Sequence, residues 1–258
     1  MSRGAALAFN RLQPPHFEAA NLPAEPDILL EEGAVFVMNK PGGLLTQGPP
    51  GIDSLEFRTK HFLKIRDEKP GKVYLGVPHR LDRPVSGAIT VVKNVRAAQR
   101  ISKQLEERTV TKTYWAVVEG TPTQSEGRME HWMRKIPDQA KSEIVDASHP
   151  DAKRAILDFR VLEASDERAL LEIELQTGRT HQIRLQCSTM GLPIVGDRLY
   201  GATQTFGPET ADERQRWIAL HARRLAFEHP INKTQVDQTA PLSEHWHVFD
   251  EFQTTLFG

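Results

Sequence analysis

The sequence predicts an α+β fold, built on a long mixed and mainly antiparallel sheet with flanking helices. Segments that alternate apolar and polar side chains, or that are continuously apolar, outnumber segments with helical spacing. Hairpins also outnumber strand–helix–strand crossovers. The chain has 258 residues, 39% of them hydrophobic, which is enough to fill one large core.

The first 30 residues differ from the rest of the chain. They are rich in Pro, Ala and polar residues without sustained periodicity, so we expect an N-terminal extension over residues 1–30 and one domain over residues 31–258. The segments expected next are a buried strand over 34–38, a helix over 54–65, a strand over 73–77, a polar loop over 79–86 and a buried strand over 88–92.

The middle of the chain carries a helix and a strand. Asn94 predicts the N-cap of a helix that ends at Glu107, because apolar side chains recur between them at helical spacing. Residues 110–118 are expected to form a strand, in which successive side chains point to opposite faces. Lys112 and Tyr114 then lie on the same face.

The second half contains the clearest hairpin, over residues 154–176 with its turn at 164–167. Thr180 predicts the cap of a helix that ends at Gly191, where glycine tolerates the left-handed conformation. A last strand is expected over residues 218–227.

Composition and charge limit the function classes. The formal net charge is -1, so any nucleic-acid binding must come from local basic patches and not from bulk positive charge. No apolar run approaches the roughly 20 residues of a membrane-spanning helix. The single cysteine, Cys187, excludes an internal disulfide and a multi-cysteine zinc site, and it fits a reducing cytoplasm. We expect a monomer.

The loop HRLDRPVSG, residues 79–87, places the carboxylate of Asp82 between Arg80 and Arg83. Two neighbouring guanidinium groups favour an ionised carboxylate, as a nucleophile or a base requires. The alternative is a structural salt bridge that holds the loop. The spacing alone does not decide between them.

A second polar segment is QTGRTHQIRLQ, residues 176–186. Free backbone N–H groups of a helical first turn, with Arg179, His181 and Arg184, could hold a phosphate or a carboxylate. The alternative is a capped helix with basic surface residues. His181 has no partner at metal-ligand spacing, so no metal site is expected. Tyr114 is either a packing residue or a stacking platform for an extracted base.

Four segments in one order resemble the RluA family of pseudouridine synthases. They are VFVMNKPGGLLT (35–46), HRLDRPVSGAITVVKN (79–94), KTYWAVVEG (112–120) and TGRTHQIRLQCSTMGLPIVGDRLYG (177–201). A fifth, LHARRLAFEHP (220–230), is similar to the closing strand of the family. The resemblance covers residues 35–230, most of the chain.

The resemblance implies roles for five residues. Asp82 matches the catalytic aspartate of the family, and Arg184 matches the basic residue that pairs with it. Tyr114 matches the aromatic ring that stacks on the target uracil. Arg80 matches the arginine that helps to hold the RNA open, and Ile183 matches an apolar residue that packs near the base.

The resemblance also implies the reaction. The chain would isomerise uridine to pseudouridine in structured RNA, transfer or ribosomal, in a central RNA-binding cleft and without a cofactor. Arg83, Arg179 and His181 are further candidates for RNA contacts. Val85 stands where the family often has Thr, and the helix continues with an unusual LQCSTMG. These departures bear on the subgroup and its target RNA more than on the reaction.

Two other functions remain open at this point. One is a catalytically silent RNA-binding protein of the same fold, which would have no need of Asp82, Tyr114 and Arg184 together. The other is a hydrolase with Asp82 as covalent nucleophile, for which the sequence offers no glycine-rich phosphate loop, metal cluster or serine triad signature.

Overall fold

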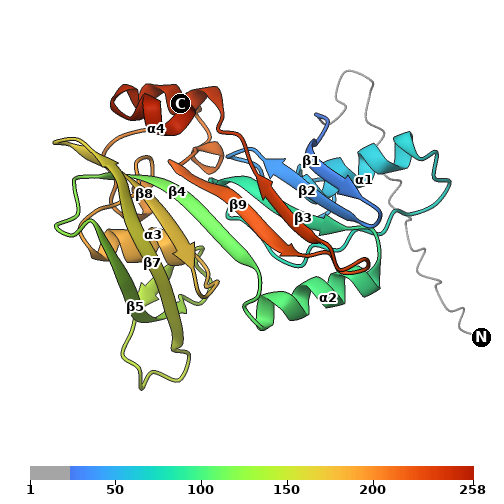
Figure 1. Ribbon diagram of the computed structural model, residues 1–258, viewed down its shortest axis with the longest axis horizontal. Helices are drawn as coiled ribbons and strands as arrows, with labels where there is room; N and C mark the ends of the chain where they lie inside the picture. The colour runs from blue at the N-terminus through green and yellow to red at the C-terminus, as the bar shows by residue number, and fades with distance from the viewer. Residues whose placement is uncertain (1–23) are drawn as a thin grey trace, which may run out of the picture.

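A computed structural model describes residues 24–258, and its strands form a single mixed sheet (Figure 1). Neighbouring strands follow the order β1-β2-β3-β9-β4-β8-β7-β5-β6, with β10 paired to β9. The β3–β9 pair is parallel and the other strand pairs are antiparallel, which confirms the predicted class. The strands are β1 (Asp27–Glu32), β2 (Val35–Lys40), β3 (Ser86–Val92), β4 (Thr111–Glu119), β5 (Glu126–Lys135), β6 (Ser142–Ile144), β7 (Lys153–Ala164), β8 (Arg168–Leu175), β9 (Leu220–Glu228) and β10 (Gln235–Thr239).

Two helices cover opposite faces of the sheet at β2 and β3. They are α1 (Leu55–Arg66) and α2 (Val95–Glu106). Alternate side chains of a strand point to opposite faces. Phe36 and Met38 accordingly pack in one apolar cluster with Leu63 of α1, while Val37 packs in another with Ile101 of α2. Both faces of β2 are therefore buried, as its apolar sequence predicts.

The middle of the sheet is formed by β4 and β9, between the half that carries α1 and α2 and the half formed by β5, β7 and β8 with α3 (Gln182–Thr189) (Figure 1). β3 meets β9 at only two residue pairs. At one of them Gly87 has φ +112°, and a Cβ there would lie 2.4 Å from the Ala222 carbonyl oxygen. Glycine therefore sets how closely the loop before β3 approaches β9.

The C-terminal segment belongs to the same core. It folds into 3₁₀ turns at Glu244–Val248 and Asp250–Phe252 and a short helix α4 (Gln253–Phe257). Trp246, Phe249 and Phe252 are fully buried, and the Phe206 ring lies 5.4 Å from Trp246 and 5.5 Å from Phe249 between ring centroids. None of the described helices is long and apolar enough to cross a membrane.

Several predicted elements are confirmed. Asn94 caps α2 by accepting the N–H of Ala97 at 2.8 Å. The predicted hairpin is β7 and β8. The first helix and the other predicted strands, except the one at residues 73–77, lie within two residues of their expected bounds. Residues 1–23 of the predicted extension lie outside the described residues. The first strand, β1, begins at Asp27, inside the range expected to be extension.

One predicted strand and one predicted helix cap are wrong. Residues 73–77 form a single bridge, between Gly76 and Val92, and no strand. β9 pairs with only Ser86 and Gly87 on that edge of β3, and the segment after residue 76 replaces backbone pairing by a side-chain contact, since the Thr90 N–H donates to the His79 ring at 2.9 Å. Thr180 does not cap α3: the N-cap is His181 at φ +56°, without a side-chain hydrogen bond. The Thr180 hydroxyl instead accepts a hydrogen bond from Arg80 at 3.3 Å.

Candidate active site

The loop before β3 fixes the backbone around Asp82. The Thr46 hydroxyl donates to the Leu81 carbonyl at 2.8 Å and accepts from the Leu81 N–H at 3.2 Å. The Val85 N–H donates to the Asp82 carbonyl at 3.0 Å and closes a turn. The Asp82 side chain keeps 21% of its surface exposed. The backbone is held from two sides, while the carboxylate faces an open cavity.

Lys40, at the end of β2, forms hydrogen bonds with the same loop. Its buried ammonium donates to the carbonyls of Pro41 at 2.8 Å, Leu44 at 2.7 Å and Arg83 at 3.3 Å. Burial lowers the pKa of Lys40 to about 7, and the charge of Asp82 acts in the opposite direction. Lys40 thus ties the turn after β2 to the residue that follows Asp82.

Arg184 of α3 lies between two carboxylates. Its Nε and Nη2 donate to Asp197 at 2.6 and 2.7 Å, and both residues are buried. Its Nη1 lies 3.7 Å from Oδ2 of Asp82. The guanidinium also covers the Tyr200 ring at 5.1 Å from the centroid. A bidentate pair fixes the plane of the guanidinium, so Asp197 aims the remaining nitrogen of Arg184 at Asp82.

His181 approaches Asp82 from the start of the same helix. Its Nε2 lies 3.7 Å from Oδ2 of Asp82, and its Nδ1 lies 3.0 Å from the Tyr200 hydroxyl. That hydroxyl also accepts the Ser142 N–H at 2.8 Å. Burial lowers the pKa of His181, and the Asp82 charge partly offsets this. The Tyr200 hydroxyl has one proton, and its two possible acceptors are His181 Nδ1 and the Ser142 carbonyl at 3.3 Å. When the proton goes to Nδ1, the neutral imidazole directs Nε2–H at Asp82.

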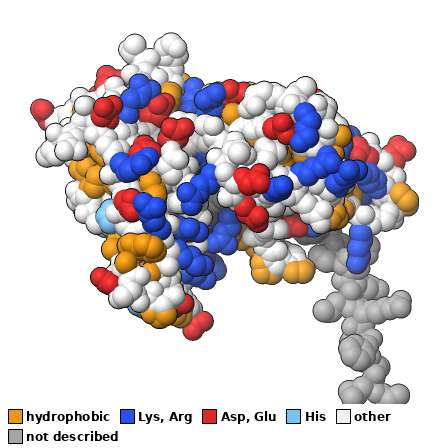
Figure 2. Space-filling model, turned by 60° about the horizontal axis from the view of Figure 1, so that its bottom comes forward, with side chains coloured by type: hydrophobic (Ala, Val, Ile, Leu, Met, Phe, Trp, Pro, Cys, Tyr) orange, Lys and Arg blue, Asp and Glu red, His pale blue; other side chains and the backbone are white. Residues whose placement is uncertain are grey.

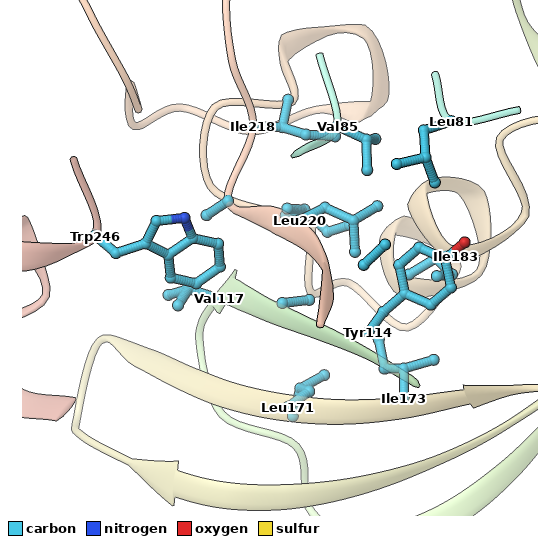
Figure 3. Packing of buried hydrophobic residues seen from close by; sticks show 14 of the residues in the cluster. Leu81, Val85, Tyr114, Val117, Leu171, Ile173, Ile183, Ile218, Leu220 and Trp246 are labelled. Carbon is cyan, nitrogen blue, oxygen red and sulfur yellow. The ribbon is translucent and has the colours of Figure 1, made fainter. Parts of the chain in front are cut away.

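Tyr114 and Ile183 belong to one buried apolar cluster (Figure 3), and both line the cavity that Asp82 faces. Tyr114 comes from β4 and Ile183 from α3, and their side chains are largely buried. Within residues 24–258 the Tyr114 hydroxyl has no hydrogen-bond partner. Burial raises the pKa of Tyr114 above its usual range, and the charge of Asp82 adds to this effect. The phenol is therefore neutral and free to contact a ligand.

These side chains surround one cavity of about 560 Å³. Seven of the eight residues singled out from the sequence line it, namely Arg80, Asp82, Tyr114, Arg179, His181, Ile183 and Arg184. Arg83 does not line it, because its Nε donates to the Gly43 carbonyl at 2.9 Å. A cavity of this size, lined by many charged and polar side chains beside apolar ones, suits a large polar ligand.

The charge partners of Asp82 differ from those expected from the loop sequence. Neither Arg80 nor Arg83 forms an ion pair with it within the described chain. The turn at residues 83–84 sends the Arg83 side chain toward Gly43, while Arg80 extends to Thr180. The structural salt bridge considered as an alternative is thus absent from this loop. The ion-pair partner of Asp82 is Arg184 of α3, about 100 positions further along the chain.

Sequence reasoning missed three residues that support the site. Lys40, Asp197 and Tyr200 all lie in the segments NKPGG and GDRLYG, quoted only for their resemblance. A lysine or an aspartate in a buried position is rarely unpaired, but burial at these positions was not readable from periodicity. No three His, Cys, Asp or Glu side chains between residues 24 and 258 are grouped so that they could hold a metal ion.

Comparison with known proteins gives the family. Residues 34–189 match the model of the RNA pseudouridylate synthase family. The chain belongs to this family. An uncharacterized RNA pseudouridine synthase, YlyB, of Bacillus subtilis is 34% identical over 89% of this chain and 74% of its own length. The ribosomal large subunit pseudouridine synthase D of Haemophilus ducreyi is 31% identical over 88% of this chain and 69% of its own.

A solved structure supports the same conclusion. Human RNA pseudouridylate synthase domain containing 1 superposes on this synthase with a TM-score of 0.65 at 26% identity, over 88% of this chain and 86% of the other. The prediction of an enzyme that isomerises uridine in RNA is confirmed at the level of the family. The roles of single residues in the synthase remain predictions.

Proposed function

We propose that Asp82 is the carboxylate with which this synthase converts uridine to pseudouridine. The observation that carries the proposal is the position of its side chain. Oδ2 faces the cavity at 3.7 Å from both Arg184 and His181, and both oxygens of the neighbouring Asp197 are engaged by Arg184. Asp82 is therefore the carboxylate of this cluster that is available to a substrate.

The reaction breaks the N1–C1′ bond, turns the freed uracil and forms a C5–C1′ bond. The hydrogen at C5 is finally replaced by one at N1, so atoms and electrons balance without a second substrate. Asp82 would act by attack at C1′ or by removing the proton at C2′, and both routes require the ionised form. A two-carboxylate glycosidase would deliver water instead. A uracil kept between Tyr114 and Ile183 rejoins the sugar before water replaces it.

The target uridine must leave its stack before its ribose can reach Asp82. Everting a base costs a few kcal/mol, least in loops and bulges. We propose that Arg80, whose guanidinium lies at the rim near Thr180, fills the vacated position. Arg179, Arg83 and His181 are proposed as further RNA contacts, with His181 reaching the nucleotide beside Asp82.

The RNA substrate is proposed to be structured ribosomal or transfer RNA. Several relatives carry the name ribosomal large subunit pseudouridine synthase D, which favours the large ribosomal RNA. We also propose a monomeric enzyme of the cytoplasm. All reactive groups of the cavity come from one chain, and the single cysteine is buried and free, which suits a reducing compartment.

Incubation with unmodified ribosomal and transfer RNA transcripts tests the proposal. Isomerisation leaves the RNA mass unchanged and creates sites for a label specific for pseudouridine. A hydrolase would change the mass, and a silent RNA-binding protein would bind without either effect. Absence of labelled product from both RNA classes, with RNA bound, would overturn the proposed activity. Comparing modification maps of cells with and without the protein would then identify the uridine.

A further inference from the structure

The cavity extends well beyond the groups around Asp82. One wall follows the end of α2 and the start of β4, through Ser102, Leu105, Glu106, Arg108, Val110 and Lys112. A hollow is visible near the middle of the face turned forward in Figure 2, and Lys and Arg side chains gather beside it. None of the groups assigned to the chemistry lies along this wall, so it is available to another part of the substrate.

Lys112 is the unexplained group of this wall. It lies two residues before Tyr114 on β4, so the two side chains share a face and both line the cavity. Within residues 24–258 no carboxylate pairs with its ammonium and no hydrogen bond engages it. Burial lowers the pKa of Lys112, and no nearby anion offsets the effect. A largely desolvated ammonium without a partner destabilises the folded protein unless a ligand supplies hydrogen-bond acceptors or negative charge.

Lys112 differs from Lys40 in the contacts of its ammonium. Lys40 is more deeply buried, yet three backbone carbonyls satisfy its ammonium. The ammonium of Lys112 has no such partners and points toward Gly178, where an added Cβ would lie 3.6 Å from it. Arg108, at φ +60°, lines the same wall and has no ion pair within the described chain. Glu106 is the acidic residue of this wall, and it is exposed.

We propose that Lys112, with Arg108, forms a phosphate subsite that holds a phosphodiester of the RNA strand beside the everted uridine. The inference rests on the proposed function, since it places the strand relative to a base on Tyr114. Two residues of a strand span about 7 Å, so the backbone of that nucleotide lies within reach of the lysine. A compact ammonium suits a phosphate oxygen as a point charge.

The shape of the cavity favours a strand over a free ion. Ser102 and Glu106 border both the cavity and an adjacent groove along α2, which is also lined by Gln99 and Tyr74. A strand that enters a site must leave it again, and an open-ended groove permits this. A site built for free phosphate would have no need of the opening.

RNA binding by a Lys112→Met variant tests the subsite, in an Asp82→Asn background so that no turnover occurs. Each phosphate contact to a single strand contributes about 0.7 to the slope of log K against log salt concentration. We expect Lys112→Met to reduce the slope by about this amount and to weaken binding about tenfold at low salt. Lys112→Arg should keep most of both. Lys72→Met, at an exposed lysine without an ion pair within residues 24–258, is the matched control and should change neither.

Thermal unfolding separates this role from a structural one. Removing an unpaired buried charge is expected to leave the unfolding temperature unchanged or to raise it. A lower unfolding temperature, or an unchanged salt slope, would overturn the inference. Inorganic phosphate should displace RNA from the protein no better than chloride does at equal ionic strength. If phosphate displaced RNA more effectively than chloride, and if this difference were lost in Lys112→Met, Lys112 would belong to a site for free phosphate and the RNA assignment would be overturned. If the wild type made no pseudouridine, the proposed function would be overturned. The dependence of the salt slope on Lys112 would still be measurable, so the two proposals can fail separately.

Discussion

The two carboxylates on either side of Arg184 should respond in opposite ways to the same substitution. Asp197→Asn removes the charge from a pair with bonds of 2.6 and 2.7 Å between residues that are 1% and 5% exposed. Breaking a buried pair typically costs about 3–5 kcal/mol, because the remaining charge is uncompensated. For a chain of this length, that lowers the unfolding temperature by about 6–20 °C.

Asp82→Asn should be nearly neutral for stability. Its carboxylate makes only contacts at 3.7 Å and is partly exposed, so its loss should change the free energy of unfolding by less than about 1 kcal/mol. Pseudouridine formation should nevertheless be lost. Asp197→Asn should keep part of its activity below its unfolding temperature, because Asp82 itself is intact.

Thermal unfolding by circular dichroism and a product assay at low temperature measure both effects. The reasoning would be refuted by an Asp82→Asn variant as unstable as Asp197→Asn, or by an Asp197→Asn variant with wild-type stability. The first result would make Asp82 a structural partner of Arg184. The second would mean that Asp197 does not hold the guanidinium.

Substitutions at three further residues, Tyr114, Gly87 and His221, test other contacts of the fold and the site. Tyr114→Phe should fold as the wild type does and still bind RNA, because the hydroxyl has no partner in the described chain, whereas Tyr114→Ala should lose about 3–5 kcal/mol of stability; equal losses in urea unfolding would contradict this. Gly87→Ala should cost at least about 2 kcal/mol, since its Cβ would lie 2.4 Å from the Ala222 carbonyl oxygen at φ +112°; wild-type urea unfolding would exclude the close approach. Burial lowers the pKa of His221 to about 4, so the unfolded chain binds a proton near pH 6.5 that the folded chain binds only near pH 4, and stability falls as the pH falls through this window. His221→Gln should make that fall shallower by about 1 kcal/mol per pH unit; an unchanged pH profile of unfolding would show that His221 is not held neutral.

Local patterns predicted those elements whose burial follows a simple period. The alternation of β7 and β8 and the cap at Asn94 were readable because each depends on neighbouring residues. β5 was not predicted. Only Met129 and Met133 of its ten residues are buried apolar side chains, and most of the others are charged, so its strand character comes from pairing with β7. Residues 73–77 look like a strand but pair with β3 only at Gly76 and Val92, because the His79 side chain and not the backbone takes the Thr90 N–H.

The site was predictable only in part for the same reason. Asp82 and Arg184 could be singled out through the resemblance, since no local pattern brings residues 100 positions apart together. Asp197 and Tyr200 escaped notice because their role depends on contacts with α3 that arise only in the folded chain. Arg83 was misjudged as a charge partner of Asp82, because neighbours in an irregular loop can point in different directions.

The rate of pseudouridine formation by Asp82→Asn in a single turnover is the most direct test of the central claim. Enzyme in excess over a transcript that the wild type modifies removes any effect of weaker binding or slow release. The account predicts RNA binding within a few fold of the wild type and no product above the level without enzyme. A single-turnover rate within about tenfold of the wild type, a change of only about 1.4 kcal/mol in the barrier, would show that another group does the chemistry.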